Sequence, residues 1–444
     1  MYPPRTEYAR SGDANIAYQV VGDADVDVLL APHFFHHVEL WWDSRHHTAF
    51  ARAVAEFSRL ILFDKRGTGM SDRTSGVPPF DVQMDDVRAV LDAAGSERAV
   101  IWAGGDATPM ITLFAASFPE RVLGLVLWNP FPTYVRNPEM PWLPSAEEFR
   151  SQIDETARAL EDPDALVGSD GAPSFRTPEE AREYWRVCRL STSRGDHLAF
   201  ANVLADTDAR HVLPAIRVPT LVLSNEALEE LHPTTRYVAD RIPTARLAIV
   251  PGDDAIMLVG SSKPMLDEVR AFVEEVRALP AEEPDRVLAT VLFTDIVGST
   301  AIAADLGDAR WRELLREHHA RVRRELARFR GRELDTAGDG FFATFDGPAR
   351  AIRCACAVRD AVRELGIEIR AGLHAGECEL LDAKVTGIAV SLGARVAARA
   401  APNEVLVSST VKDLVAGSGI EFDDRGSAEL KGIPGEWRLY AVAS

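Results

Sequence analysis

The chain has 444 residues, of which 46% are hydrophobic, and a formal net charge of −19 at pH 7. This apolar content suffices for the cores of two globular domains. The acidic excess argues against nucleic acid or an anionic membrane surface as a partner, because binding to either needs clustered Lys and Arg. No apolar run approaches the roughly 18 residues of a membrane span and no apolar leader opens the chain, so we expect a cytoplasmic protein with no membrane span.

The chain before residue 280 alternates short apolar runs with helical stretches, the pattern of a mainly parallel sheet covered by helices on both faces. Residues 141–210 lack strand patterning and carry helical charge periodicity, which predicts an inserted helical lid. The predicted strands are the runs 15–21, 26–31, 60–64, 99–103, 122–128, 220–224 and 246–250. The predicted helices span 49–57, 84–94, 108–118, 233–241 and 264–278.

Three segments of this region match a known family. They are Asp64-Lys65-Arg66-Gly67-Thr68-Gly69-Met70-Ser71-Asp72, the run 118–122 and the run 219–223. On these segments, residues 1–279 resemble the α/β-hydrolase family. The resemblance implies a doubly wound α/β sheet with a helical lid.

A working hydrolase of this family needs a nucleophile at the turn from strand to helix, an acid, and a histidine base. Aligning the turn on Pro109 places Gly105 at the nucleophile position, and Ala255 stands where the family has its histidine. We therefore predict a hydrolase-like domain that is catalytically silent. Asp106 is an alternative nucleophile in a frame shifted by one residue, but Ala255 supplies no base for the second step.

The space under the lid of a silent hydrolase fold is an apolar pocket. We expect this domain either to bind a small-molecule ligand that regulates the second domain or to serve as a dimerisation scaffold, and both alternatives stay open. Two prolines and three acidic residues then interrupt any helix between Leu279 and Asp285. We predict a linker at 280–286 and a second domain at 287–444.

Two aspartates stand at the ends of predicted strands in the second domain. Asp295 closes the apolar run 287–293, and Asp339 lies in a Gly-Asp-Gly turn between the short runs 333–337 and 341–345. Adjacent strands would bring both carboxylates to one end of a sheet. Mg²⁺ and Mn²⁺ take such oxygen ligands, and two ions about 4 Å apart activate an attacking oxygen and stabilise the leaving one. The pattern predicts a two-metal site for phosphoryl chemistry.

Five motifs of residues 287–444 together resemble the class III nucleotidyl cyclase catalytic domain. They are Phe293–Thr300, Gly338–Phe345, Arg370–Glu377, Gly387–Arg395 and Glu429–Gly432. The resemblance implies a ferredoxin-like α+β fold with helices on one face of the sheet. It also implies head-to-tail homodimers whose active sites are shared between the two subunits.

The same resemblance assigns the metal ligands. Asp295, Asp339 and the carbonyl of Ile296 would hold two Mg²⁺ or Mn²⁺ ions in each active site. Cyclisation of a nucleoside triphosphate requires the ribose 3′ oxygen to attack the α-phosphorus and expel pyrophosphate, so growing phosphate charge must be neutralised.

The phosphate contacts come from a second group of residues. The resemblance implies that Arg395 of the partner subunit reaches the reacting phosphate and that Lys431 contacts the terminal phosphates. The planar fork of a guanidinium matches phosphate oxygens. Ser391, four residues before Arg395, lies on the same face of a predicted helix and stands where the family has an assisting asparagine.

The base-selecting positions depart from the family. Asp335 replaces the lysine that adenylyl cyclases use to select adenine, and Ile388 replaces its aspartate partner. With Thr300 and Lys431, these two residues form the predicted substrate-binding set. We expect a homodimeric cyclase acting on ATP, with GTP, CTP or UTP as alternative substrates. A degenerate nucleotide-binding protein without turnover is the remaining alternative.

Overall fold

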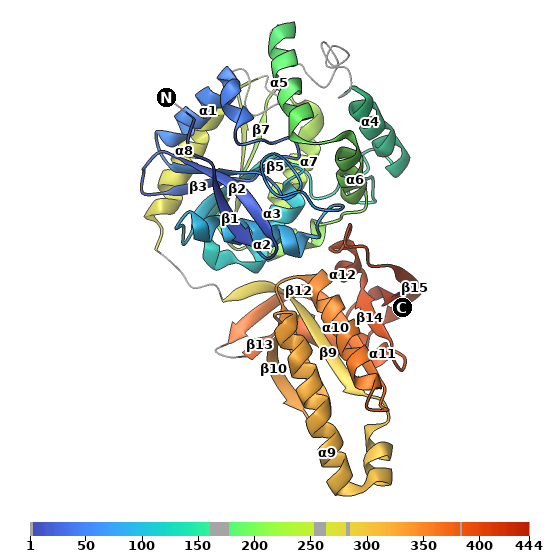
Figure 1. Cartoon of the computed structure of the whole chain (residues 1–444). Helices are drawn as coiled ribbons and strands as arrows, with labels where there is room; N and C mark the ends of the chain where they lie inside the picture. The colour runs from blue at the N-terminus through green and yellow to red at the C-terminus, as the bar shows by residue number, and fades with distance from the viewer. Residues whose placement is uncertain (1–2, 160–176, 253–262, 281–284, 382–383, 444) are drawn as a thin grey trace. The chain divides into compact units, whose positions relative to one another are not determined.

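A computed structural model describes residues 3–159, 177–252, 263–280, 285–381 and 384–443 (Figure 1). The chain divides into two compact units, one formed by residues 1–78 and 82–283 and the other by residues 79–81 and 284–444. Each unit contains its own eight-stranded sheet.

The sheet of the first unit has the strand order β1-β2-β4-β3-β5-β6-β7-β8. Strands β1 and β2 pair antiparallel, β2 is antiparallel to β4, and the sheet from β4 to β8 is parallel. The prediction of a mainly parallel sheet is therefore confirmed. The strands are β1 (Glu7–Ser11), β2 (Ala14–Val21), β3 (Asp27–Leu30), β4 (Arg59–Phe63), β5 (Ala99–Gly105), β6 (Val122–Pro130), β7 (Thr220–Asn225) and β8 (Ala245–Val250).

Helices cover this sheet as the apolar periodicity of the sequence requires. Phe50 and Val54 of α1 pack with Phe272 and Val276 of α8 in one buried apolar cluster that includes side chains of β3 to β7. Burial of this cluster is the main stabilising contribution in this unit. The covering helices are α1 (Arg45–Ala55), α2 (Phe80–Ala93), α3 (Thr108–Ser117), α7 (His232–Arg241) and α8 (Lys263–Ala278).

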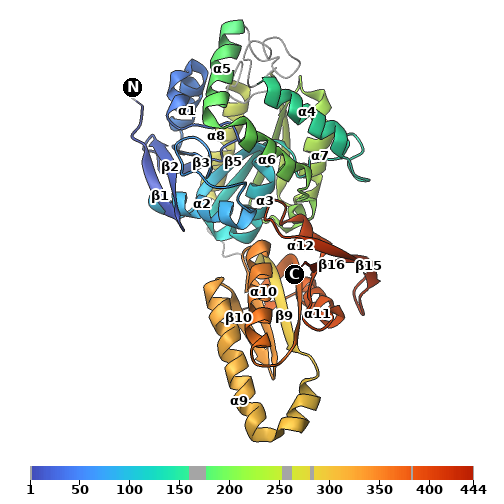
Figure 2. The same ribbon diagram turned by 45° about the vertical axis from the view of Figure 1, so that its right-hand side comes forward.

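The predicted lid is helical in its described part. It contains α4 (Ala146–Ala159), α5 (Pro178–Ser191) and α6 (Arg194–Ala205), which Figures 1 and 2 show grouped at one end of the unit. Residues 160–176 of the predicted lid lie outside the described residues. Ser193 starts α6 with its hydroxyl accepting the Asp196 backbone N–H, a normal N-cap.

The sheet of the second unit has the order β10-β11-β9-β12-β14-β16-β15, with β13 paired to β12. Its first four strands alternate with helices α9 and α10 in the order β-α-β-β-α-β, all antiparallel. This is the ferredoxin-like arrangement that the resemblance implied. The strands are β9 (Arg286–Ile296), β10 (Arg332–Ala337), β11 (Gly340–Phe345), β12 (Ile369–Leu381), β13 (Lys384–Thr386), β14 (Val405–Ser408), β15 (Phe422–Glu429) and β16 (Glu436–Val442).

The two helices of this ferredoxin-like core lie on one face of the sheet, as expected, but α11 (Ile388–Arg399) packs on the other. Helices α9 (Ser299–Arg328) and α10 (Pro348–Arg363) lie side by side (Figure 2). A Cβ on Gly372 of β12 would lie 2.0 Å from the Ala397 nitrogen of α11, so glycine permits this close approach. A short helix, α12 (Ser409–Asp413), follows β14.

In the described part of the chain, no helix combines the length and apolarity needed to cross a lipid bilayer.

Candidate functional site

The two aspartates of the predicted metal site lie at the same end of neighbouring strands in the second sheet. Asp295 is the penultimate residue of β9, which extends beyond the predicted apolar run. Asp339 lies in the turn between β10 and β11, after Gly338 with a φ of +66°, a conformation that favours glycine. The Asp339 Oδ2 accepts the backbone N–H of Ile296 at 3.2 Å. We call Asp295, Asp339 and Ile296 the carboxylate edge.

A residue that the sequence analysis did not assign to the site contacts this edge. Arg370 is the β12 residue that pairs with Asp295 in the β9–β12 register. Its Nε and Nη2 donate to Asp295 Oδ2 at 3.1 and 2.5 Å. The two side chains are 39% and 38% exposed, so water and ions have access to the pair. Arg370 is the first residue of the motif 370–377, and its place in that motif is the sequence signal that could have pointed to a role at the site.

The donors at the carboxylate edge suit a hard divalent cation, because both side chains offer carboxylate oxygen. No group of three or more His, Cys, Asp or Glu residues that could hold a metal occurs in the described ranges. Any cation bound here would therefore complete its ligand set with backbone carbonyl, water or phosphate oxygens, as Mg²⁺ sites commonly do.

A second group of predicted site residues lines a pocket of about 750 Å³. Arg395 of α11 donates from Nε to the Lys431 carbonyl at 3.1 Å, and Arg399 donates to the Glu429 carbonyl at 2.8 Å. We call the pocket lined by Arg395, Arg399 and Lys431 the basic pocket, although Glu429 and Glu436 also line it. Three cationic side chains at one hollow provide the charge that a phosphate group requires.

Asp295 and Lys431 lie near opposite strand ends of the sheet, on or beside strands that are not neighbours. Asp295 ends β9, which runs parallel to β16 through the registers with β12 and β14, whereas Lys431 precedes Glu436, the first residue of β16. Three strand spacings separate β9 from β16, or roughly 15 Å, whereas α11, which carries Arg395, packs against β9 and β12. Within one chain, Arg395 and Arg399 bond the backbone of residues 431 and 429, while Asp295 is bonded by Arg370.

The remaining predicted residues are all exposed. Ser391 lies one turn before Arg395 on α11, and Ile388, the first residue of that helix, is 63% exposed. Asp335 lies on the edge strand β10, and Thr300 lies in the first turn of α9. The structure thus places Ser391 on the same helix as Arg395, outside the lining of the basic pocket, and Thr300 on a different helix.

The turn after β5 in the first unit has the backbone of a hydrolase elbow without its nucleophile. Gly105 ends β5 with a φ of +46°, and α3 follows at Thr108. A left-handed residue between strand and helix is the strained turn on which this family carries its nucleophile. The backbone therefore supports the frame that places Gly105 at that position. Ala255, the predicted replacement of the histidine base, lies outside the described residues.

The side chain of Asp106 is bound by three donors from two other segments. His33 Nδ1 lies 2.8 Å from Oδ1, the Phe34 backbone N–H donates to Oδ2 at 2.8 Å, and Lys65 Nζ donates to Oδ2 at 3.1 Å. Burial raises the pKa of this carboxyl, but Lys65 and His33 outweigh burial and hold the pKa well below its usual range. An ionised carboxylate held by three donors is a poor nucleophile, which disfavours the alternative frame.

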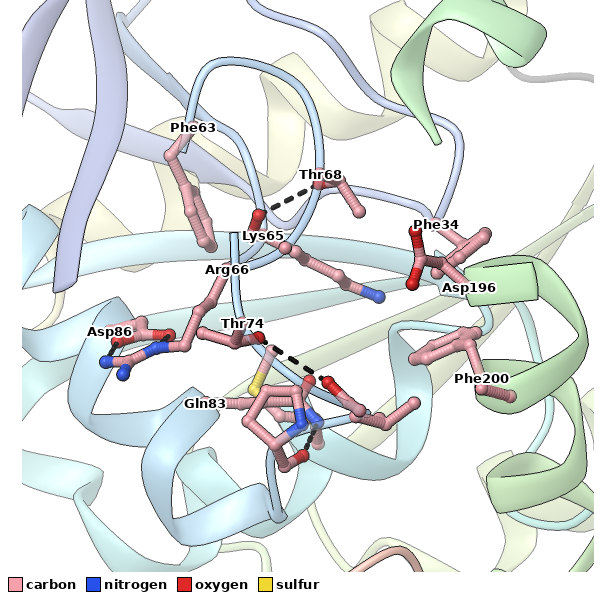
Figure 3. A pocket seen from close by; sticks show the side chains of 16 residues that line it. Phe34, Phe63, Lys65, Arg66, Thr68, Thr74, Gln83, Asp86, Asp196 and Phe200 are labelled. Carbon is pink, nitrogen blue, oxygen red and sulfur yellow. Dashed lines mark hydrogen bonds and ion pairs between the residues drawn. The ribbon is translucent and has the colours of Figure 1, made fainter. Parts of the chain in front are cut away.

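A pocket beside this cluster opens between α6 and the loop after β4 (Figure 3). Its walls are mainly apolar and include Phe34, Phe63, Met110 and Phe200. Figure 3 shows Lys65 extending toward Phe200, and its Nζ lies 4.6 Å from the centre of that ring. Arg66 instead turns to Asp86, with which it forms an ion pair at 2.6 Å. The pocket therefore combines mainly apolar walls with the Lys65 ammonium, which is paired with Asp106, and with the polar side chains of Gln83 and Asp196.

Comparison with protein families agrees with both units. Residues 280–444 match the family described as Adenylate and Guanylate cyclase catalytic domain, and residues 28–228 match the alpha/beta hydrolase fold. A bromoperoxidase from Bacillus anthracis superposes with a TM-score of 0.51 at 17% identity, covering 61% of this chain and all of that one. This likeness shows the fold of the first unit alone.

Two relatives from Rhizobium meliloti (strain 1021) match about a third of the chain. One, named "Putative adenylate cyclase 3", is 29% identical over 164 residues, which cover 33% of this chain and 27% of the relative. The other, an uncharacterised protein, is 30% identical over 171 residues, which cover 34% of this chain and 16% of the relative. The chain thus spans about a quarter or less of these relatives.

Proposed function

We propose that this chain converts a nucleoside triphosphate to the 3′,5′-cyclic nucleotide and pyrophosphate. It joins an alpha/beta hydrolase fold to a C-terminal adenylate and guanylate cyclase catalytic domain. ATP is the first candidate substrate, since a relative is named for adenylate. The observation that carries the proposal is the carboxylate edge, where Asp339 bonds the backbone of the residue after Asp295.

The carboxylate edge would hold the divalent cations that this family generally uses, Mg²⁺ or Mn²⁺. Asp295, Asp339 and the Ile296 carbonyl are the ligands we assign. When bound, two such ions lower the pKa of the 3′ hydroxyl and neutralise charge on the phosphates. The fold holds these two acids near each other before the nucleotide binds, which would lower the entropic cost of assembling the site.

The basic pocket would receive the phosphates. In the reaction, the bond between O3′ and the α-phosphorus forms, the bond from that phosphorus to the bridging oxygen breaks, and the hydroxyl proton passes to solvent. In this proposal Arg395 would donate to the α-phosphate as its charge grows, with Ser391 one turn away, and Lys431 would donate to the departing pyrophosphate. Their common location in one pocket supports these roles.

The separation of the two groups supports an active site shared between two copies of the chain. Asp295 lies near the end of β9, and Lys431 precedes the start of β16, three strands away. A second copy packed head to tail would bring its basic pocket to the carboxylate edge of the first. An isologous pair of this kind has two equivalent sites.

The choice of base rests on Asp335 and Ile388. A carboxylate accepts hydrogen bonds and cannot donate to a ring nitrogen, so Asp335 would favour the exocyclic amine of adenine or cytosine. Ile388 offers only apolar contact. This pair supports weaker discrimination among ATP, GTP, CTP and UTP than a lysine and aspartate pair would give.

The test is direct. The purified chain is incubated with Mn²⁺ and each of ATP, GTP, CTP and UTP, and 3′,5′-cyclic products are identified by mass. We expect a cyclic product that Asp295→Ala reduces by at least about a thousandfold. Nucleotide binding without any product would favour the degenerate nucleotide-binding protein instead.

The shared site has its own test. Asp295→Ala and Arg395→Ala should each be inactive alone, and mixing them should restore about a quarter of wild-type activity, because half of the pairs are mixed and each mixed pair has one intact site. Failure of the mixture to recover would mean that the two groups do not meet between chains.

The first unit would act as a regulatory domain through the pocket beside Lys65. Its mainly apolar walls, with Lys65, Gln83 and Asp196 among the lining residues, suit a small, mostly apolar molecule that carries a polar group. A thermal-shift screen with small aliphatic and aromatic amides, esters and acids tests this, with Ala199→Trp as the variant that fills the pocket. If no compound raises the melting temperature or changes the cyclase rate, the domain is a scaffold.

A further inference from the structure

The carboxylate edge carries its own counter-ion. Arg370 donates both Nε and Nη2 to the same oxygen of Asp295, at 3.1 and 2.5 Å. Because the two residues pair across β9 and β12, the backbone register holds them opposite each other. The contact is therefore built into the sheet and does not depend on a flexible loop.

The position of this guanidinium has a consequence for any cation that binds Asp295. A divalent cation at Asp295 would either share its carboxylate with Arg370, which places like charges close together, or displace the guanidinium. The side chains are more than one-third exposed, so Arg370 has room to leave. A triphosphate brings negative charge to the same place and would accept the displaced guanidinium.

Resting on the proposed function, we propose that Arg370 is a positioning residue that occupies Asp295 until the cation arrives together with the triphosphate. Arg370 weakens binding of the free cation and then turns to the phosphates once Asp295 is ligated. Cation and nucleotide are thereby coupled, because each favours the state in which the Arg370–Asp295 pair is open. The coupling makes the carboxylate edge prefer a cation–triphosphate complex over the bare ion.

A second cross-strand pair in the same unit provides a matched control. Arg438 of β16 donates to Asp424 of β15, and these side chains are 58% and 41% exposed. This pair also has a guanidinium that donates twice to one carboxylate oxygen, but it is more exposed, is not directly opposite in register, and lies on the strands farthest from Asp339. Loss of a generic surface ion pair is therefore measured by Arg438→Gln.

The experiment measures Mn²⁺ binding to the full chain by electron paramagnetic resonance of the free ion, without nucleotide and with 3′-deoxy-ATP, which has no 3′ hydroxyl to attack. We expect Arg370→Gln to tighten binding of Mn²⁺ alone by about threefold to tenfold. The enhancement of Mn²⁺ affinity by 3′-deoxy-ATP should shrink by a similar factor. Arg438→Gln should change neither quantity.

The outcomes separate this inference from the proposed function. If Asp295→Ala leaves Mn²⁺ binding intact, the metal site itself is wrongly assigned. If Asp295→Ala abolishes Mn²⁺ binding but Arg370→Gln leaves it unchanged or weaker, only the role of Arg370 is overturned. Should Arg370→Gln fail to fold, Arg370→Lys keeps the charge but loses the forked donors and should tighten Mn²⁺ binding by about twofold. An unchanged affinity in that variant also overturns the role.

Discussion

The two units each place an aspartate at the end of a sheet strand, and the two aspartates are held in opposite ways. Asp106 follows β5, is 18% exposed, and receives hydrogen bonds from His33, Phe34 and Lys65. Asp295 near the end of β9 is 38% exposed and is bonded by a single guanidinium. The neighbours of an acidic side chain thus determine whether it stabilises the fold or stays available to an external ligand.

Each environment has a physical consequence. The donors around Asp106 come from separate segments of one unit, so its charge is already neutralised and fixed in place. The carboxylate edge keeps partly exposed oxygen atoms beside a partly exposed guanidinium, which suits exchange with ions from solution. We call these the closed acid, Asp106, and the open acid, Asp295.

The largest expected effect comes from deleting each acid in turn. Asp106→Ala leaves Lys65, mostly buried, and the Phe34 N–H without their partner, which should lower the free energy of unfolding by about 3 kcal/mol. Asp295→Ala removes an exposed pair and should cost at most about 1 kcal/mol. Urea titration followed by circular dichroism measures both. Equal losses in the two variants would end the distinction between a closed and an open acid.

The pH dependence of stability tests the same contrast, because the first unit also contains a buried histidine, His47. Burial lowers the pKa of His47 to about 3. The unfolded chain, with its ordinary pKa near 6.5, therefore binds protons that the fold excludes. The stabilisation is fully present above pH 6.5 and is lost as pH falls, by about 2 kcal/mol at pH 5. His47→Gln should flatten the stability curve between pH 7 and 5; an unchanged slope would show that His47 is protonated in the fold.

The smallest expected effect concerns the elbow glycine. Gly105→Ser places a side chain at a φ of +46° and should cost about 1–2 kcal/mol. It should give no hydrolysis of p-nitrophenyl acetate, because Asp106 still occupies its donors and a serine needs a base. Gly195→Ala on α6, where an added Cβ would lie 3.8 Å from its nearest neighbour, the Ser193 hydroxyl, should be neutral or slightly stabilising. Ester hydrolysis by Gly105→Ser would contradict a silent domain.

Much of the fold follows from the sequence because apolar runs of fixed period dominate it. The parallel strands of the first unit are almost continuously apolar, so their limits agree with the structure to within two residues. Strand β1 was not predicted, since Glu7 to Ser11 is an edge strand with polar residues at most positions. An edge strand buries little apolar surface and leaves a weak pattern.

The candidate site was only partly predictable. The turn around Asp339 and the strand end at Asp295 have local signals, so their approach could be expected. The contact of Asp295 with Arg370 depends on the register between strands 75 positions apart in the chain, which no local pattern encodes. The three donors around Asp106 are likewise brought together by tertiary structure alone.

The proposed sharing of each site between two copies also has a consequence for mixtures of chains. In a symmetric pair, each site borrows half of its groups from either member. A chain that lacks both Asp295 and Arg395 would therefore silence both sites of any pair it enters and act as a dominant inhibitor. Activity would fall with the square of the fraction of intact chains, so an equal mixture would keep about one quarter.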